Sequence, residues 1–103
     1  MTIEEACQIV YTAMGRPVPK TDCIGYSREH GTIVCPTSDT EAGRAEAWRM
    51  LEWAMSQPSI GRITFRKFQT VYIAPTNKSE QGCNYAEALL LSVAAAIEAS
   101  RGG

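Results

Sequence analysis

The sequence predicts an α+β domain in which an antiparallel sheet of up to four strands is covered by three helices, in the order α-ββ-α-ββ-α. Pairs of short segments rich in β-branched and aromatic residues alternate with three amphipathic stretches, and this alternation favours an antiparallel layered domain. The second observation is a degenerate internal repeat of one ββα unit. Its matching pieces are Ile24-Gly25 with Ile60-Gly61, Pro36-Thr37 with Pro75-Thr76, and Ala45-Glu46-Ala47 with Ala86-Glu87-Ala88.

Length and composition predict one domain over residues 1–103. The chain has 45% hydrophobic and 20% charged residues, which is typical of a globular protein. A formal net charge of −1 gives no general attraction to polyanions. Because no signal peptide is visible and the apolar stretch 88–97 is too short to cross a bilayer, we expect a cytoplasmic protein.

The first helix is predicted within residues 1–15. Thr2 and Glu5 have the spacing of a capping box, and Gly15 provides a C-terminal stop. Ile3, Cys7, Val10 and Met14 follow helical spacing and predict the buried face. The prolines in 16–20 end this helix and predict a connector.

The first ββα unit is predicted over residues 23–56. Its strands are 23–27 and 32–35, joined by a turn that contains a glycine. Ser38 and Glu41 then form a second capping box ahead of a helix that reaches about Ser56. Apolar residues occupy much of the circumference of this helix, so it is expected to touch more than one layer.

The second ββα unit is predicted over residues 60–100. Strands 62–66 and 70–74 alternate, with Ile63, Phe65, Val71 and Ile73 facing inward and a turn near 67–69. The last helix runs from about Asn84 to Ser100, with a main apolar stripe of Leu89, Leu90, Val93 and Ile97.

The outer face of this second hairpin is a candidate ligand site. Arg62, Thr64 and Arg66 share it with Tyr72, and Lys67 lies at the turn. Guanidinium groups bind phosphate oxygens and an aromatic ring stacks on a base, so the group suits a phosphate-bearing ligand such as a nucleotide. The alternative is an ordinary solvated sheet face.

The two Pro-Thr loops form a second candidate site. Thr37 and Ser38 precede the second helix, and Thr76 and Asn77 precede the third, where free backbone amides can receive an anion. Such residues also serve as ordinary helix caps, and this structural role is the alternative.

No catalytic residue, metal site or cofactor is predicted. Cys23, His30, Cys35 and Cys83 lack the close pairs typical of zinc sites. Cys7 and Cys35 fit buried positions, which leaves Cys83 as the least implausible nucleophile. The glutamates, Glu46 among them, could supply acid–base pairs, but most of them fit helix starts or solvent faces.

The second helix also offers a candidate protein interface. Trp48 and Trp53, together with neighbouring methionines, give it more apolar surface than one sheet face can bury. A homo-oligomer or a target protein would cover this excess. Burial between the sheet and the first helix is the alternative.

The layout resembles the phage "ABA sandwich" domain family, small proteins largely without assigned activity. The resemblance lies in Ala13-Met14-Gly15, Tyr26-Ser27, the stretch 37–42 leading to Ala47-Trp48, and the stretch 85–91. Arg16 stands where the family pattern has tryptophan. The resemblance implies a phage accessory protein that counters host defence in the host cytoplasm.

The expected function is therefore a non-enzymatic, anti-defence binding protein that sequesters an anionic, nucleotide-type immune signal. We expect it to be a homo-oligomer that buries the excess apolar surface of the second helix. One alternative is an inhibitor that blocks a host defence protein by direct contact. A small enzyme of unrecognised type is a further alternative.

Overall fold

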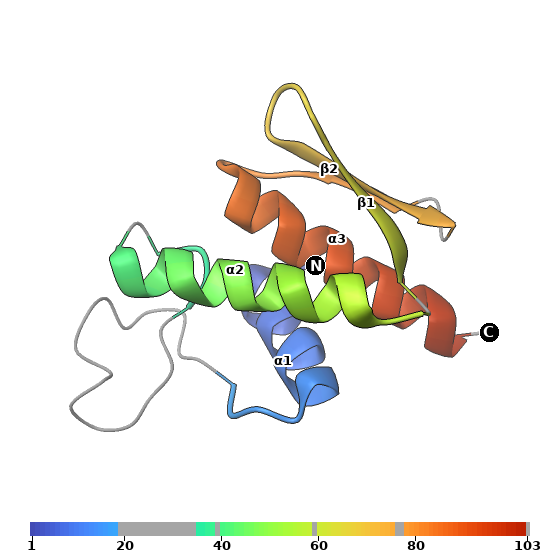
Figure 1. Cartoon of the computed structure of the whole chain (residues 1–103), viewed down its shortest axis with the longest axis horizontal. Helices are drawn as coiled ribbons and strands as arrows, with labels where there is room; N and C mark the ends of the chain where they lie inside the picture. Colours follow the sequence, from blue (N-terminus) through green and yellow to red (C-terminus); the bar gives the residue numbers. More distant parts are fainter. Residues whose placement is uncertain (19–34, 39, 59, 76–77, 103) are drawn as a thin grey trace.

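Three helices lie on one side of a three-stranded antiparallel sheet (Figure 1). The computed structural model describes residues 1–18, 35–38, 40–58, 60–75 and 78–102. Its elements are α1 (Ile3–Met14), α2 (Glu41–Ser56), β1 (Gly61–Arg66), β2 (Thr70–Pro75), β3 (Lys78–Gln81) and α3 (Tyr85–Gly102). The prediction of an α+β fold is confirmed. A fourth strand and the internal repeat stay predictions, because the first hairpin lies outside the described residues.

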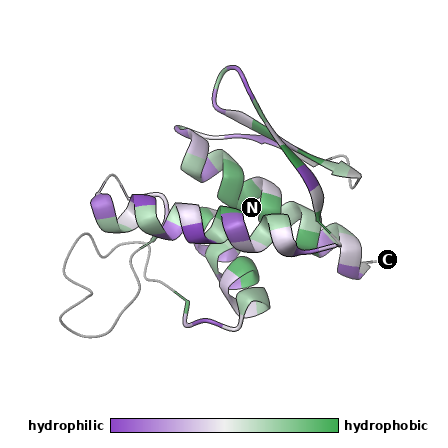
Figure 2. Cartoon of the chain, viewed as in Figure 1, coloured by the Kyte–Doolittle hydropathy of each residue, from purple (hydrophilic) through white to green (hydrophobic). Residues whose placement is uncertain are grey.

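Helix α3 is the centre of the core. It packs against β2 and β3 on one side and against α1 on the other, and its middle part is hydrophobic over most of its surface (Figure 2). A helix enclosed by two layers requires apolar residues around its circumference. Those that are buried are Ala88, Leu89, Leu90, Val93, Ala94, Ala96 and Ile97. The buried Ser92 hydroxyl donates a 2.8 Å hydrogen bond to the Val71 carbonyl, so its polar group is satisfied within the core.

Helix α1 begins and ends as predicted. The Thr2 hydroxyl accepts from the Glu5 amide at 3.1 Å, and the Glu5 carboxylate accepts from the Thr2 amide at 2.9 Å. Gly15 ends the helix with φ 74°, a left-handed conformation that favours glycine. Cys7 and Val10 are buried as expected, and Tyr11 is buried with them.

The N-cap of helix α2 lies two residues after the one that the sequence suggested. Thr40, not Ser38, is the N-cap, since the Thr40 hydroxyl accepts from the Gly43 amide at 3.0 Å. The Ser38 carbonyl instead lies so close to Gly43 that a Cβ there would come within 2.3 Å of it. The loop therefore folds back onto the first turn of α2, and this close approach requires glycine.

The sheet has the order β1-β2-β3, with both pairs antiparallel. The β1–β2 hairpin is confirmed, with Ile63 opposite Ile73 and Phe65 opposite Val71. Val71 and Ile73 are fully buried, whereas Phe65 is 48% exposed. Strand β3 was not predicted. Its four residues are all polar, so it shows no alternation of apolar and polar positions, and backbone pairing with β2 defines it.

Candidate functional site

Three exposed aromatic rings from three different elements surround an apolar pocket of about 280 Å³, which we call the aromatic groove. Trp48 of α2 is 62% exposed, Phe65 of β1 48% and Tyr85 of α3 41%. The remaining lining residues are Arg44, Ala47, Leu51, Ala86 and Leu89. Large apolar side chains gathered at one exposed place are typical of a binding site.

The fold fixes two of these rings against each other. Phe65 and Tyr85 meet edge to face, with ring centroids 5.9 Å apart and an interplanar angle of 70°. The Tyr85 hydroxyl also donates to the Arg66 carbonyl at 2.5 Å, which ties the start of α3 to the end of β1. Trp48 completes the groove from the facing helix. The wall formed by Phe65 and Tyr85 is thus preorganised.

The charge at the groove comes from α2. Arg44, an exposed residue one helical turn before Trp48, is the charged member of the lining. An arginine beside aromatic rings favours an anionic group near an apolar anchor. The groove therefore combines an apolar interior with a cationic edge.

The predicted basic face of the hairpin is present on the side of the sheet away from the helices. The Arg66 guanidinium lies 4.4 Å from the centroid of the Tyr72 ring, and Thr64 pairs with Tyr72 across the strands. Arg62 is on the same face but at the other end of β1, opposite Ala74. The structure thus brings Arg66 and Tyr72 together and places Arg62 roughly 13 Å along the strand.

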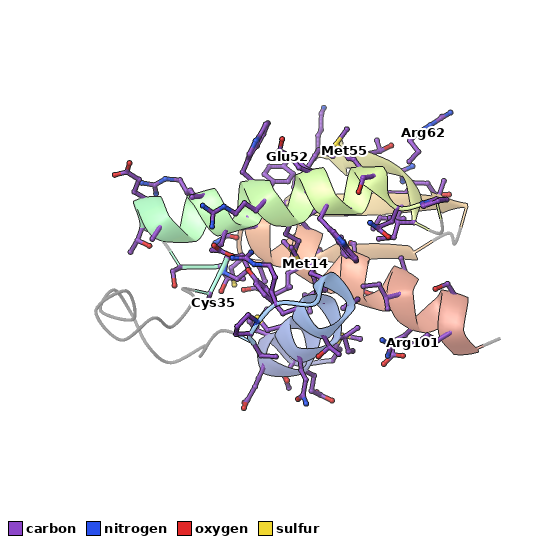
Figure 3. The ribbon with its side chains drawn as sticks, turned by 60° about the horizontal axis from the view of Figure 1, so that its bottom comes forward. Met14, Cys35, Glu52, Met55, Arg62 and Arg101 are labelled. Atoms are coloured by element: carbon purple, nitrogen blue, oxygen red, sulfur yellow. The ribbon has the colours of Figure 1, made fainter. Side chains whose placement is uncertain are left out.

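The first Pro-Thr loop is occupied by internal contacts. The Thr37 hydroxyl lies 3.1 Å from the Cys35 sulfur, and the Ser38 amide donates to the Cys35 carbonyl at 3.0 Å. Figure 3 shows Cys35 near the start of α2. Thr76 and Asn77, the matching residues of the second loop, lie outside the described residues.

A buried carboxylate joins α1 to α2. The Glu46 carboxylate is 8% exposed and accepts from the Tyr11 hydroxyl at 2.8 Å. Arg16 donates to both of its oxygens, at 2.8 and 3.2 Å, and Arg49 donates at 2.9 Å. Glu46 departs from the helix starts and solvent faces expected of most of the glutamates, because its spacing to Gly43, Met50 and Ala54, all buried, puts it on the inner stripe of the helix.

The electrostatics of this group, which we call the Glu46 junction, favour the ionised carboxylate. Burial acts to raise the pKa of Glu46, but hydrogen bonds from Arg16 and Tyr11 and the charges of Arg16 and Arg49 outweigh it, so the pKa is lowered. Burial and the bond to Glu46 raise the pKa of Tyr11, and the same carboxylate raises the pKa of Arg16. Glu46, Tyr11 and Arg16 are thus held in the protonation states that their hydrogen bonds require.

Of the two predicted interface tryptophans, only Trp48 reaches the groove. Trp53 is half-buried and packs against the core. Trp53 thus packs within this chain and does not line the groove. Phe65 and Tyr85 were missed as interface residues because Phe65 fits the inward alternation of its strand and Tyr85 stands at a helix start; their proximity depends on the tertiary fold.

The cysteines divide into a buried pair and an exposed residue. Cys7 and Cys35 are buried as predicted, with their sulfurs 3.8 Å apart, whereas Cys83 is exposed. Cys23 and His30 lie outside the described residues. Within the described ranges, no three histidine, cysteine or acidic side chains gather as metal ligands would.

Comparison of the chain with protein-family models, with curated proteins and with solved structures finds no match. Among the described residues, none of the helices has the length and apolar content needed to span a bilayer.

Proposed function

We propose that this chain is a binding protein that takes a segment of a partner protein in the aromatic groove. The observation that carries the proposal is the convergence of Trp48, Phe65 and Tyr85, all more than 40% exposed, around one pocket. Aromatic side chains in a preformed pocket supply most of the affinity in many protein interfaces. The chain acts by binding its partner and blocking the surface that it covers.

The groove specifies the chemistry of that segment. Its volume lies just below the usual range of small-ligand pockets and suits one large apolar side chain. Arg44 at the edge favours an acidic residue close to this anchor. We therefore expect the bound segment to carry an aromatic or long aliphatic side chain with an aspartate or glutamate nearby. The resemblance to phage accessory proteins makes a host defence protein our candidate source.

A random-peptide display selection against the purified full chain tests this function. Enriched peptides are expected to share an apolar anchor flanked by acidic residues. Their affinity for the Trp48→Ala variant should fall at least tenfold, because truncation removes one wall of the groove. Met55→Ala is the matched control: Met55 is 66% exposed on the same helix but does not line the groove, so its affinity should equal that of the wild type.

Two outcomes would overturn the proposal. Selected peptides that bind Trp48→Ala as tightly as the wild type would place recognition elsewhere. A dimer in native mass spectrometry that Trp48→Asp dissociates and Met55→Asp does not would mean that a second copy occupies the groove.

The outer face of the sheet supports a second candidate, the sequestration of a nucleotide-type ligand. The supporting observation is the Arg66 guanidinium held over the Tyr72 ring, with Arg62 on the same face. Phosphate oxygens would meet the guanidinium groups while a base stacks beside them.

A thermal-shift screen with mononucleotides and cyclic dinucleotides tests this second candidate. Binding raises the melting temperature by mass action, and Arg66→Ala should abolish the rise. Arg101→Ala removes an equal charge from the exposed end of α3 and should leave the rise unchanged. No rise with any nucleotide would reject this site. Recovery of chemically altered ligand from the denatured complex would indicate an enzyme instead.

A further inference from the structure

The buried cysteine pair lies where α1 meets the loop before α2. The sulfurs of Cys7 and Cys35 are 3.8 Å apart, although the residues are 28 positions apart in the chain. The exposed fractions of the two residues are 0% and 1%. Disulfide bonding requires a sulfur separation of about 2.05 Å, so the two atoms need to approach by less than 2 Å. Small side-chain rotations can supply a movement of this size.

One sulfur of the pair is set up as the nucleophile. The Thr37 hydroxyl lies 3.1 Å from the Cys35 sulfur, and the Cys7 sulfur lies 3.8 Å from it, on α1. The contact with Cys7, joined by the hydrogen bonds with Thr37, lowers the pKa of Cys35 to about 6 against the opposing effect of burial. The same contact and burial raise the pKa of Cys7 above its ordinary value. Cys35 is therefore the more acidic thiol of the pair.

We propose that Cys7 and Cys35 are a redox modification site, at which a peroxide joins the two sulfurs in a disulfide that ties α1 to the start of α2. The Cys35 thiolate attacks one peroxide oxygen and becomes a sulfenic acid, and the peroxide O–O bond breaks to release hydroxide. The Cys7 sulfur then attacks the Cys35 sulfur, the S–O bond breaks, and a second hydroxide leaves. The protons of the two thiols convert these hydroxides to two waters, so two thiols and one peroxide yield one disulfide.

A peroxide fits this position because the pair is enclosed. Hydrogen peroxide is little larger than water, whereas a bulky disulfide oxidant would have to displace the side chains that bury both sulfurs. Thr37, which contacts the reacting sulfur, is itself only half-buried. This hydroxyl marks the side from which a small oxidant approaches.

The disulfide would change the stability of the α1–α2 connection. Cross-linking residues 28 positions apart removes conformational freedom from the unfolded chain. For a domain of this size, we expect the melting temperature to rise by roughly 10 °C on oxidation and to return on treatment with dithiothreitol.

Peroxide titration of the full wild-type chain tests the proposal. After oxidation, free thiols are alkylated under denaturing conditions and the peptides are mapped by mass spectrometry. The expected product is a Cys7–Cys35 cross-linked peptide, lighter by two hydrogen atoms than the reduced pair. Thr37→Val, which keeps the side-chain shape and removes the hydroxyl, should slow its formation several-fold.

The exposed Cys83 provides an internal reference for the same experiment. Alkylation of both Cys7 and Cys35 after Cys83 has been fully oxidised would overturn the proposal, and so would a cross-link that joins either of them to Cys23. A Cys23→Ser/Cys83→Ser variant retains only the buried pair. In that variant, a melting temperature that does not rise with peroxide would reject the stabilising link.

Discussion

On one side of α2 the Glu46 carboxylate accepts four hydrogen bonds of 3.2 Å or less, whereas on another side Trp48 leaves 62% of its surface to solvent. We call the Glu46 junction closed, because both oxygens of its carboxylate accept hydrogen bonds from donors within this chain. The aromatic groove is open, because its exposed rings line a pocket. Two unusual features on one helix therefore have different roles: the satisfied polar group holds the fold together, and the exposed apolar group is available to a partner.

The largest effect on stability is expected from a substitution that breaks the Glu46 junction. Glu46→Ala removes the acceptor for Tyr11 and Arg16 and leaves their donors at a partly buried site. We expect the free energy of unfolding to fall by about 3 kcal/mol, measured by urea denaturation. Glu52→Ala, an exposed change on the same helix, should stay within about 0.5 kcal/mol of the wild type. Equal losses for the two variants would show that the junction does not hold α1 to α2.

The two tryptophans test the comparison directly. Trp53→Ala removes a half-buried ring that packs on the core, and we expect a loss of about 2 kcal/mol in the free energy of unfolding. Trp48→Ala should cost less than about 1 kcal/mol, because its ring is mostly exposed. Chemical denaturation of both variants gives the two values. The reverse order would mean that the groove contributes more to stability than to binding.

A smaller loss is expected from a single donor of the junction. Tyr11→Phe keeps the buried ring and removes the hydroxyl that bonds Glu46 at 2.8 Å. The carboxylate retains Arg16 and Arg49, so we expect a loss of about 1 kcal/mol in the free energy of unfolding. A loss as large as that of Glu46→Ala would instead indicate that the tyrosine hydroxyl organises the whole group.

The sequence predicted those parts of the fold that depend on local pattern. The capping box of Thr2 and Glu5, the left-handed Gly15 and the alternation in the β1–β2 hairpin each involve residues close in the chain, and each is confirmed. Strand β3 could not be predicted, because a short polar strand is defined by pairing with β2.

The candidate site was less accessible to sequence reasoning. Trp48 was identified from its excess apolar surface, but Phe65 and Tyr85 come from segments whose local pattern assigns them to the sheet face and a helix start. Their meeting depends on how β1 and α3 pack against α2. Glu46 shows the opposite case: helical spacing alone places it on the inner stripe, while its charge suggested solvent. Helical position outweighed residue type because Arg16, just after the end of α1, compensates the buried charge.

The smallest effect is the pH dependence of the stability that the Glu46 junction contributes. The pKa of Glu46 is lowered in the folded chain from its ordinary value of 4.5, by hydrogen bonds and charges that burial partly offsets. The folded state therefore binds this proton less readily than the unfolded state, so its stabilising contribution is present above pH 4.5 and is lost as the pH falls through the folded value. Urea denaturation from pH 6 to pH 3 should show the stability difference between wild type and Glu46→Gln shrinking toward the acid end. The hydrogen bonds with Thr2 also lower the pKa of Glu5. Glu5 is present in both the wild type and Glu46→Gln, so its contribution cancels in the stability difference between them. A difference that stays constant with pH would mean that the carboxylate acts there by shape alone, and the contrast between the two sides of α2 would then rest on packing instead of charge.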